Sequence, residues 1–369
     1  MSPETKSPNR FKKSIVLVII FFLCVTVHVS AFPPTFILGS SLDYNDADDN
    51  EDQLWYGLYG VGSWRSTIGQ GGYTALSGNF NARYSDEESR SFDDSESLKG
   101  TLGFPVPAGM LLIESAISSS FDDVDYGTVL RPQWSTRYNL WKGPHYNIPL
   151  SPYLIYSGFY LYQELGVQDR FSHEIGIGVT YDPSIKIGYR FELTGKAELW
   201  NGDYTEDLSE FYTLESTTKR TDVATSAEVE VNGLAGYFAD WSVLFRGGSR
   251  LSNDEQYLSD DLMETEGTDT FFVYTEGVLS WSPTRQIGLS SSLYAEVKKY
   301  MDRNAYADDG SLGSTPLSLL DVGGNLEFDW TPNNKLYFLG SVSGYKTFSD
   351  GPNYDGWNYG VSVGIEYGF

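Results

Sequence analysis

Cysteine, histidine and basic residues are scarce in this chain of 369 residues. One Cys and three His are too few for a disulfide framework or for a zinc or iron–sulfur site. Lys and Arg number 25 against 50 Asp and Glu, and because neutralising phosphates requires clustered basic residues, this balance argues against nucleic-acid binding. We therefore expect no metal, no cofactor and no nucleic-acid partner.

Glycine and aromatic residues are abundant instead. The chain has 38 Gly and 27 Tyr, and aromatic residues make up 15 % of it. So many aromatic side chains argue against a disordered chain. No apolar run after the one near the N-terminus approaches the length of a membrane-spanning helix. This composition is typical of an all-β protein.

Residues 1–31 have the layout of a secretory signal peptide. A basic segment comes first, residues 14–27 form an almost unbroken apolar run, and residues 29–31 end in the small residues of a cleavage site. The run is short for a spanning helix, and the residues before Cys24 lack the small residue of a lipoprotein site. We therefore expect 1–31 to be removed and 32–369 to form a single exported domain.

Strict alternation of apolar and polar residues runs through this exported part. In 357–369 every odd residue is apolar or aromatic, and every even residue is small or polar. Segments 185–199 and 320–330 show the same period of two, which is the pattern of a strand with one apolar face. Such segments are longer than an ordinary strand, which has about five or six residues.

Sixteen strands are predicted in total. They are 35–43, 55–66, 72–84, 97–104, 108–120, 126–141, 150–162, 170–181, 185–200, 222–232, 237–250, 270–282, 285–299, 316–330, 335–348 and 356–369. Fourteen strands are the alternative. The first of these segments has the weakest pattern, and without it two other segments would have to form one strand to keep the number even.

The connections between these strands alternate between a short and a long class. Short ones such as 105–107 and 182–184 contain a single acidic residue, Asp182, whereas most acidic residues lie in long ones such as 201–221 and 251–269. Short periplasmic turns and long extracellular loops are the anatomy of an outer-membrane barrel. The sequence therefore predicts one closed antiparallel transmembrane β-barrel with long acidic extracellular loops.

The chain resembles Gram-negative bacterial outer-membrane β-barrel proteins, and the porins in length and strand number. The C-terminal strand resembles the family's assembly signal, a terminal Phe preceded by apolar residues at alternating positions: Val361, Val363, Ile365, Tyr367 and Phe369. The resemblance implies the bacterial cell outer membrane, insertion by the barrel-insertion machinery, and contact with outer-membrane lipid and lipopolysaccharide. No porin subfamily motif is recognised, and whether the barrel forms a homotrimer stays open.

The polar faces of the predicted strands supply candidates for the lining of a pore. These are Arg83, Lys99, Arg131, Arg137, Arg190, Glu192, Glu228, Glu230, Arg246, Asp321, Glu327 and Asp329. Among the charged residues assigned to these polar faces, basic ones dominate from Arg83 to Arg170 and only acids occur from Asp321 onward, which allows opposite walls to carry opposite charge. The alternative is that these charges pair across neighbouring strands and merely hydrate the lumen.

Aromatic residues beside the short turns are expected to form a girdle at the periplasmic interface. They are Phe104, Trp141, Tyr153, Tyr181, Tyr237, Trp281, Trp330, Tyr367 and Phe369. A second group, Tyr156, Tyr160 and Tyr162, shares one face of segment 150–162. A lumenal stripe of this kind can stack on sugar rings, and wall packing is the alternative.

The acidic loops contain dense clusters of carboxylates, at 46–52, 86–94 and 254–264. Hard cations bind carboxylate oxygens, but none of these clusters matches the EF-hand pattern. The clusters are more typical of a solvated face that enriches cations at a channel mouth.

Sixteen strands leave an aqueous channel unless something plugs it. We therefore expect a porin-like channel for passive diffusion of ions and small polar solutes, leaning toward cations. One alternative is a closed barrel that acts as surface scaffold or adhesin through its acidic loops. Another is a rim hydrolase that uses His173, but Ser172 and Glu174 precede and follow it on the strand and point to the opposite side. We therefore expect no enzymatic activity.

Overall fold

The computed structural model describes most of the exported part of the chain. The described residues are 35–47, 50–68, 71–85, 92–122, 127–142, 148–163, 170–184, 186–200, 204–209, 212–216, 221–252, 255–257, 265–267, 269–306, 312–333, 335–350 and 356–369. The predicted signal peptide, residues 1–31, lies outside them.

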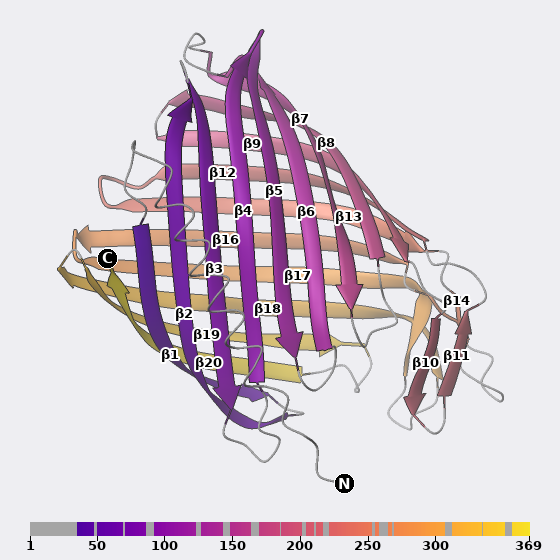
Figure 1. The fold of residues 1–369 in the computed structure, drawn as a ribbon. Helices are drawn as coiled ribbons and strands as arrows, with labels where there is room; N and C mark the ends of the chain where they lie inside the picture. The colour runs from indigo at the N-terminus through magenta and orange to yellow at the C-terminus, as the bar shows by residue number, and fades with distance from the viewer. Residues whose placement is uncertain are drawn as a thin grey trace.

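Sixteen strands form one closed barrel, and each pairs antiparallel with the next along the chain (Figure 1). They are β1 (Thr35–Ala47), β2 (Asn50–Ile68), β3 (Gly72–Ser85), β4 (Phe92–Val106), β5 (Gly109–Asp122), β6 (Gly127–Leu140), β7 (Leu150–Gln163), β8 (Arg170–Ser184), β9 (Ile187–Trp200), β12 (Thr221–Leu234), β13 (Ala239–Ser252), β16 (Thr270–Thr284), β17 (Ile287–Tyr306), β18 (Leu312–Asn333), β19 (Leu336–Ser349) and β20 (Gly356–Gly368). The predicted fold class and the number sixteen are confirmed, and the alternative of fourteen strands is excluded.

The first and last strands close the barrel. The β1–β20 ladder runs from Ile37 opposite Gly368 to Ala47 opposite Asn358, and the amide of Phe369 donates to the carbonyl oxygen of Phe36 at 2.9 Å. Because the strand number is even, the start of β1 and the end of β20 lie at the same end of the barrel. Closure leaves no unpaired sheet edge, which is the condition for a sheet to exist inside a bilayer.

Several strands extend beyond their alternating segments. β1 continues to Ala47 and β2 begins at Asn50. The sequence predicts a loop over 44–54 in this region. The predicted loop at 300–315 is shortened in the same way by β17 and β18. Backbone groups at these ends continue to pair although their side chains no longer alternate, because an unpaired N–H or C=O is costly.

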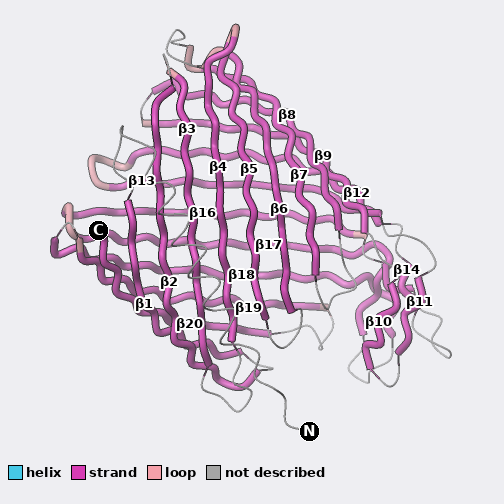
Figure 2. Tube along the Cα trace, viewed as in Figure 1, coloured by secondary structure: helices cyan, strands magenta, loops and turns pink. Residues whose placement is uncertain are grey.

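Two small sheets lie within the two longest predicted loops. β10 (Tyr204–Ser209) pairs with β11 (Tyr212–Ser216), and β14 (Glu255–Tyr257) pairs with β15 (Thr265–Gly267). Strands account for nearly all of the described part of the trace in Figure 2. The part of the chain that the structure describes contains no helix of the length and apolarity needed to cross a membrane.

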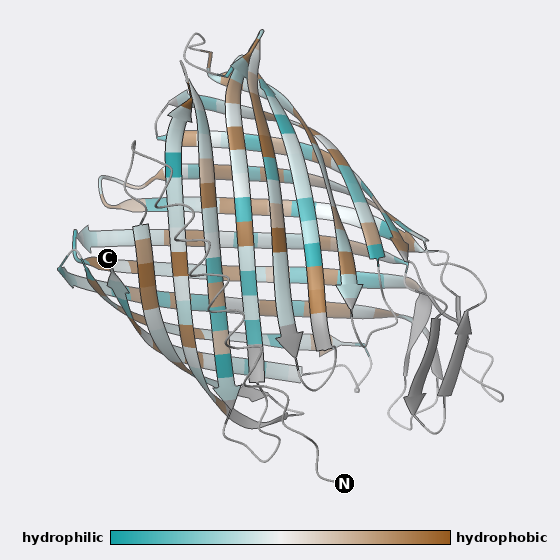
Figure 3. Ribbon diagram, in the orientation of Figure 1, coloured by the Kyte–Doolittle hydropathy of each residue, from teal (hydrophilic) through white to brown (hydrophobic). Residues whose placement is uncertain are grey.

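One face of the wall is polar and the other is apolar. The pairing register shows which residues of each strand lie on which face. Asn139, Ser151, Ser172, Glu198 and Asp222 are polar and buried, and all of them lie on one face, whereas most exposed Leu, Ile and Val side chains lie on the other. A concave inner face crowds its side chains together, so the polar face is the inner one. Hydrophilic and hydrophobic bands succeed one another along the strands in Figure 3.

Inward tyrosines cover glycines on the neighbouring strand at four places in the wall. The pairs are Tyr59 with Gly39, Tyr73 with Gly103, Tyr153 with Gly178 and Tyr294 with Gly323. At each glycine an added Cβ would lie 2.3–2.6 Å from the tyrosine ring. Each ring therefore lies along the wall, where it shields the bare backbone of the glycine strand.

Candidate functional site

The candidate site is the inner wall of the barrel. The register places all twelve predicted pore-lining residues on this face. Whether they contact a permeating solute stays a prediction, but their neighbours can be described. The structure brings some of them together in ion-pair networks and leaves others without a charged partner among the described residues.

One network joins four of the predicted residues across β9, β12 and β13. Glu228 is the centre, and it accepts from Arg190 and from both Nε and Nη2 of Arg246, at 2.7 and 2.6 Å. Arg190 also contacts Glu230 at 2.8 Å. Only 12 % of the Glu228 side chain is exposed, so this carboxylate is largely withdrawn from water. The network fixes two guanidinium groups flat against the wall.

A second network lies further along the same strands. Arg250 pairs with Asp222, which also accepts a hydrogen bond from the Ser252 hydroxyl at 2.5 Å. Lys196 contacts Glu198 at 2.5 Å. These residues have the same parity as the predicted ones on the same strands, so parity is the signal that finds them.

Lys99 and Asp321 each form an ion pair with a residue that is not among the twelve predicted ones. Lys99 contacts Glu114 at 2.8 Å, and Asp321 lies 3.8 Å from Lys298 and accepts from the Thr347 hydroxyl at 2.6 Å. Much of the wall charge therefore pairs across adjacent strands, as the alternative interpretation of the sequence holds.

Arg131 and Arg137 of β6 have aromatic partners instead of carboxylates. The guanidinium carbon of Arg131 lies 4.2 Å from the centre of the Phe159 ring, and that of Arg137 lies 3.7 Å from the centre of the Tyr153 ring. Neither forms an ion pair with a carboxylate of the described residues. Stacking on a ring leaves the edge of a guanidinium free to donate, because donors project in the guanidinium plane.

Tyr153 corrects one prediction. It is 2 % exposed, points inward, and donates to Glu192 at 2.5 Å, so it is not a girdle residue. The sequence did not resolve the faces of β7, because that strand carries apolar residues on both. Ser151 and Ser157 share its parity and supply the missed signal.

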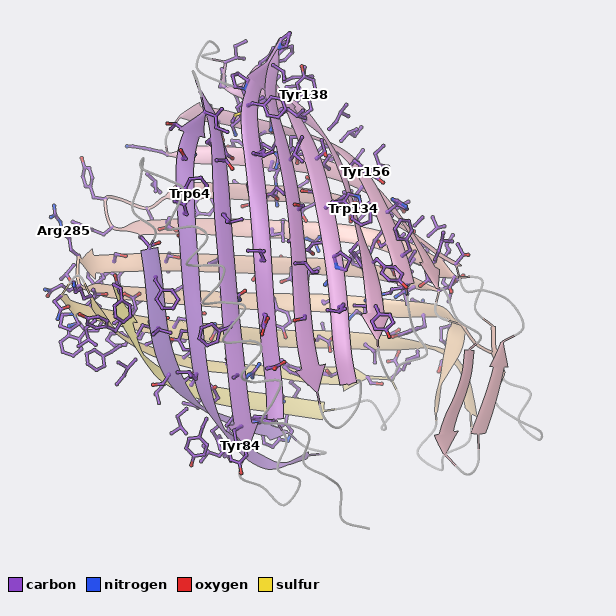
Figure 4. All side chains as sticks on the ribbon, in the orientation of Figure 1. Trp64, Tyr84, Trp134, Tyr138, Tyr156 and Arg285 are labelled. Atoms are coloured by element: carbon purple, nitrogen blue, oxygen red, sulfur yellow. The ribbon has the colours of Figure 1, made fainter. Side chains whose placement is uncertain are left out.

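The Tyr156, Tyr160 and Tyr162 stripe is also corrected. The register places all three on the outer face, and Tyr156 and Tyr162 are 42 % and 41 % exposed. Figure 4 labels Tyr156 on the outside of the wall. These rings cannot form a lumenal stripe for sugars.

The other eight girdle candidates lie on the outer face or at the short-turn end of the barrel. Tyr237 is 99 % exposed in the β12–β13 turn, and the outward Trp281 and Trp330 are 47 % and 42 % exposed. Arg285, in the β16–β17 turn, also projects from this end (Figure 4). Exposed rings of this kind suit the headgroup layer, where their apolar body and polar edge meet different surroundings.

Three acidic candidates lie on β18, and the two arginines on β6 lie opposite them. In ring order β6 is the sixth strand and β18 the fourteenth, half a circumference away. Glu327 and Asp329 are exposed to the lumen and form no ion pair among the described residues. Uncompensated charge of opposite sign therefore lies on opposite walls.

His173 of β8 faces outward. Its Nδ1 shares a hydrogen bond with the Tyr156 hydroxyl at 2.7 Å, and its ring meets Phe171 edge-on at 4.2 Å. Ser172 and Glu174 point to the opposite, inner side. The structure brings no carboxylate to His173 within the described residues.

Metal ligation has no candidate in the described part of the chain, which contains no group of three or more His, Cys, Asp or Glu residues suited to hold an ion. The three acidic loop clusters predicted at 46–52, 86–94 and 254–264 lie almost entirely outside the side chains that the structure describes.

No family model matches the sequence, and no curated protein matches it either. Among solved structures, the barrel is similar to the in-vitro folded outer membrane protein OmpT of Vibrio cholerae in its trimer form. The two are 10 % identical over 92 % of this chain and 100 % of that one, with a TM-score of 0.47.

Two further solved structures are similar to the barrel. OccD1 (OprD) is 10 % identical over 93 % of this chain and 97 % of its own, with a TM-score of 0.48. OccD3 (OpdP) of Pseudomonas aeruginosa is 11 % identical over 92 % of each chain, with a TM-score of 0.41. Likeness at this level extends to the fold and no further.

The wall itself indicates where the protein resides. A closed sheet satisfies its backbone without water, and its outer face is a belt of exposed Leu, Ile, Val and aromatic side chains. Barrels with an even number of antiparallel strands and such a belt are the outer-membrane type. The chain is therefore a closed β-barrel of the bacterial outer-membrane type, without a specific subfamily.

Proposed function

We propose that this protein is a channel for passive diffusion of ions and small polar solutes, with a preference for cations. The observation that carries the proposal is the closed wall of sixteen strands with a polar inner face. Eight strands give an interior that side chains fill, whereas sixteen leave room for water.

The inner side chains support an open interior because they lie along the wall. The ion pairs of Arg190, Arg246 and Arg250 join strands at most two positions apart in the ring. Tyr59 and Glu366 likewise meet across the single strand β1, at 2.8 Å. None of these ion pairs and hydrogen bonds reaches the opposite wall.

The preference for cations follows from the charge balance. Acidic side chains outnumber basic ones on the described inner face, and the whole chain has a formal charge of −25. A lumen of one dominant sign raises the local concentration of counter-ions. Unpaired Glu327 and Asp329 add an acidic stretch that Arg131 and Arg137 face from the other side.

Single-channel conductance in a planar bilayer tests this function. Purified protein should give large, stable steps, and a salt gradient should give a reversal potential of the sign for cation permeation. Absence of steps from correctly folded, heat-modifiable protein would contradict an open channel and favour the scaffold or adhesin alternative. His173→Ala should leave the steps unchanged, and a lipid- or peptide-hydrolysing activity lost in that variant would instead support the hydrolase.

A further inference from the structure

A cavity of about 290 Å³ opens on the inner wall at the seam between β1 and β20. Its lining comes from five strands that are consecutive in the ring, β19, β20, β1, β2 and β3. The polar part of the lining consists of Ser41, Asp43, Tyr59, Asn81, Arg83 and Ser362. The volume lies just below the range of about 300–1,000 Å³ for small-molecule pockets, which favours a solute of one ring over a chain of rings.

Glycine at one position of β20 explains why the wall is hollow here. Gly364 pairs with Ser41 of β1, which pairs in turn with Gly57 of β2. The Ser41 hydroxyl occupies the space above Gly57, where an added Cβ would clash with it. At Gly364 the nearest side-chain atom to an added Cβ would be the Tyr59 hydroxyl oxygen, 3.6 Å away. The floor of the cavity is therefore bare backbone, with the apolar Leu339 of β19 beside it.

The polar groups around this floor differ in what they donate and accept. The Asp43 carboxylate only accepts, the Arg83 guanidinium only donates, and the Asn81 side-chain amide does both. The Ser41 hydroxyl donates to Asp43 at 2.9 Å, and its oxygen can still accept. A solute that satisfies all of these groups must therefore carry donors and acceptors together.

The charge of the lining favours a neutral solute. Asp43 and Arg83 are its one acidic and its one basic residue, so the lining as a whole has no net charge and attracts neither anions nor cations. A hydroxyl group donates and accepts without carrying a charge. A polyhydroxylated solute can therefore satisfy the lining, and one such molecule replaces several water molecules, so fewer molecules are ordered for the same hydrogen bonds.

We propose that this cavity is a subsite for a neutral sugar of one ring, whose hydroxyl groups are hydrogen-bonded by Asp43, Asn81 and Arg83. Leu339 supplies an apolar contact for the C–H groups of the ring. The inference rests on the proposed channel function, because the solute reaches the inner wall through the lumen. The site is distinct from the tyrosine stripe on β7, which faces outward.

Current block in single channels is the direct test, with D-glucose as the probe. Tetrahydropyran, which is the ring of glucose without its hydroxyl groups, is the matched control compound. Glucose should reduce the current through the open channel in a saturable way, and tetrahydropyran should not do so at the same concentrations. Equal block by both compounds would mean simple obstruction of the lumen and would overturn the proposal. Stronger block by glucuronate or glucosamine than by glucose would indicate an ion site and would overturn it as well.

Two variants and a matched control locate the block. Asp43→Asn should raise the half-blocking concentration of glucose about tenfold, because it removes a charge-assisted hydrogen bond, and Asn81→Leu should raise it about threefold or more. Glu276→Gln also neutralises an inward carboxylate, but on β16 and outside the cavity, so it should leave the value unchanged. Heat-modifiable migration checks that each variant is folded. Retained block in both cavity variants, or an equal loss in the Glu276 variant, would refute the subsite.

A second readout keeps this test separate from the channel function. Saturation-transfer NMR on the barrel, in a detergent without a sugar headgroup, should show glucose bound to the wild type and to the Glu276 variant. The signal should be weakened or lost in the Asp43 and Asn81 variants. If the protein gives no conductance steps yet binds glucose in this pattern, the channel fails and the subsite stands. Steps without glucose binding by either method retain the channel and overturn the subsite.

Discussion

At the residue scale, glycines of the wall leave the space that tyrosine rings on neighbouring strands occupy. Gly178 of β8 lies under the Tyr153 ring, which is held in turn by Glu192 and by the stacked guanidinium of Arg137. The phenol, the carboxylate and the guanidinium therefore depend on the absence of a side chain at one position.

Gly178→Ala should destabilise the barrel. Its Cβ would lie 2.3 Å from Cζ of Tyr153 and 2.7 Å from the backbone oxygen of Phe191, so the ring or the backbone must shift. We expect the free energy of unfolding in urea to fall by about 1–3 kcal/mol, the usual cost of overpacking.

Gly195→Ala is the matched control, because an added Cβ there meets no atom within 4 Å. It should leave the free energy of unfolding unchanged or raise it by up to about 1 kcal/mol, since Ala is better than Gly inside a strand. Equal destabilisation by both substitutions would show that the Tyr153 contact is not the cause.

At the scale of elements, the seam between β1 and β20 closes the barrel with the residues that resemble an assembly signal. Val361, Val363, Ile365, Tyr367 and Phe369 all point outward. The Phe369 ring is 68 % exposed, and its centre lies 4.9 Å from that of Tyr367. A ring so exposed contributes little to packing, which leaves recognition during insertion as its proposed role.

Phe369→Ala should therefore separate assembly from stability. We expect less folded barrel in the outer membrane of expressing cells, measured by heat-modifiable migration, but near-normal refolding of the purified chain in detergent. Phe271→Ala, which removes another outward ring that is 54 % exposed, serves as the control and should assemble normally. Failure of the Phe369 variant to refold in detergent would assign the ring a role in stability instead.

At the scale of the whole molecule, closure of the barrel places residues that are far apart in the sequence on opposite sides of the lumen. Arg131 and Arg137 are separated from Glu327 and Asp329 by about half of the sequence, yet β6 and β18 face each other in the ring. The field between them is strongest where side chains on both walls lack ion-pair partners, because paired charges largely cancel at a distance.

Neutralising the acidic wall should change ion selectivity. The double variant Glu327→Gln and Asp329→Asn should lower the ratio of cation to anion permeability by a factor of about two to five, and Arg137→Gln should raise it. The reversal potential in a salt gradient measures both. High salt should reduce both effects because it screens exposed charge, and shifts of the same sign in both variants would contradict opposed walls.

The sequence by itself determined the class of the fold. A period of two makes one face apolar without any tertiary contact, and it predicted strands such as 185–200 and 316–330 close to the bounds of β9 (Ile187–Trp200) and β18 (Leu312–Asn333). Charge sorting between short and long connections gave the topology for a similar reason, since turns and loops meet different surroundings. The twelve wall residues followed from the same parity.

Only the tertiary structure decided which wall residues meet. In β7 both faces carry apolar residues, so the sequence assigned Tyr153 to a girdle and left the Tyr156 face open, whereas the ladders with β6 and β8 fix both. The pairing of Glu228 with two arginines, and the stacking of Arg131 and Arg137 on aromatic rings, depend on register. Register is set by hydrogen bonding between strands and by closure of the ring, which no local pattern of side chains specifies.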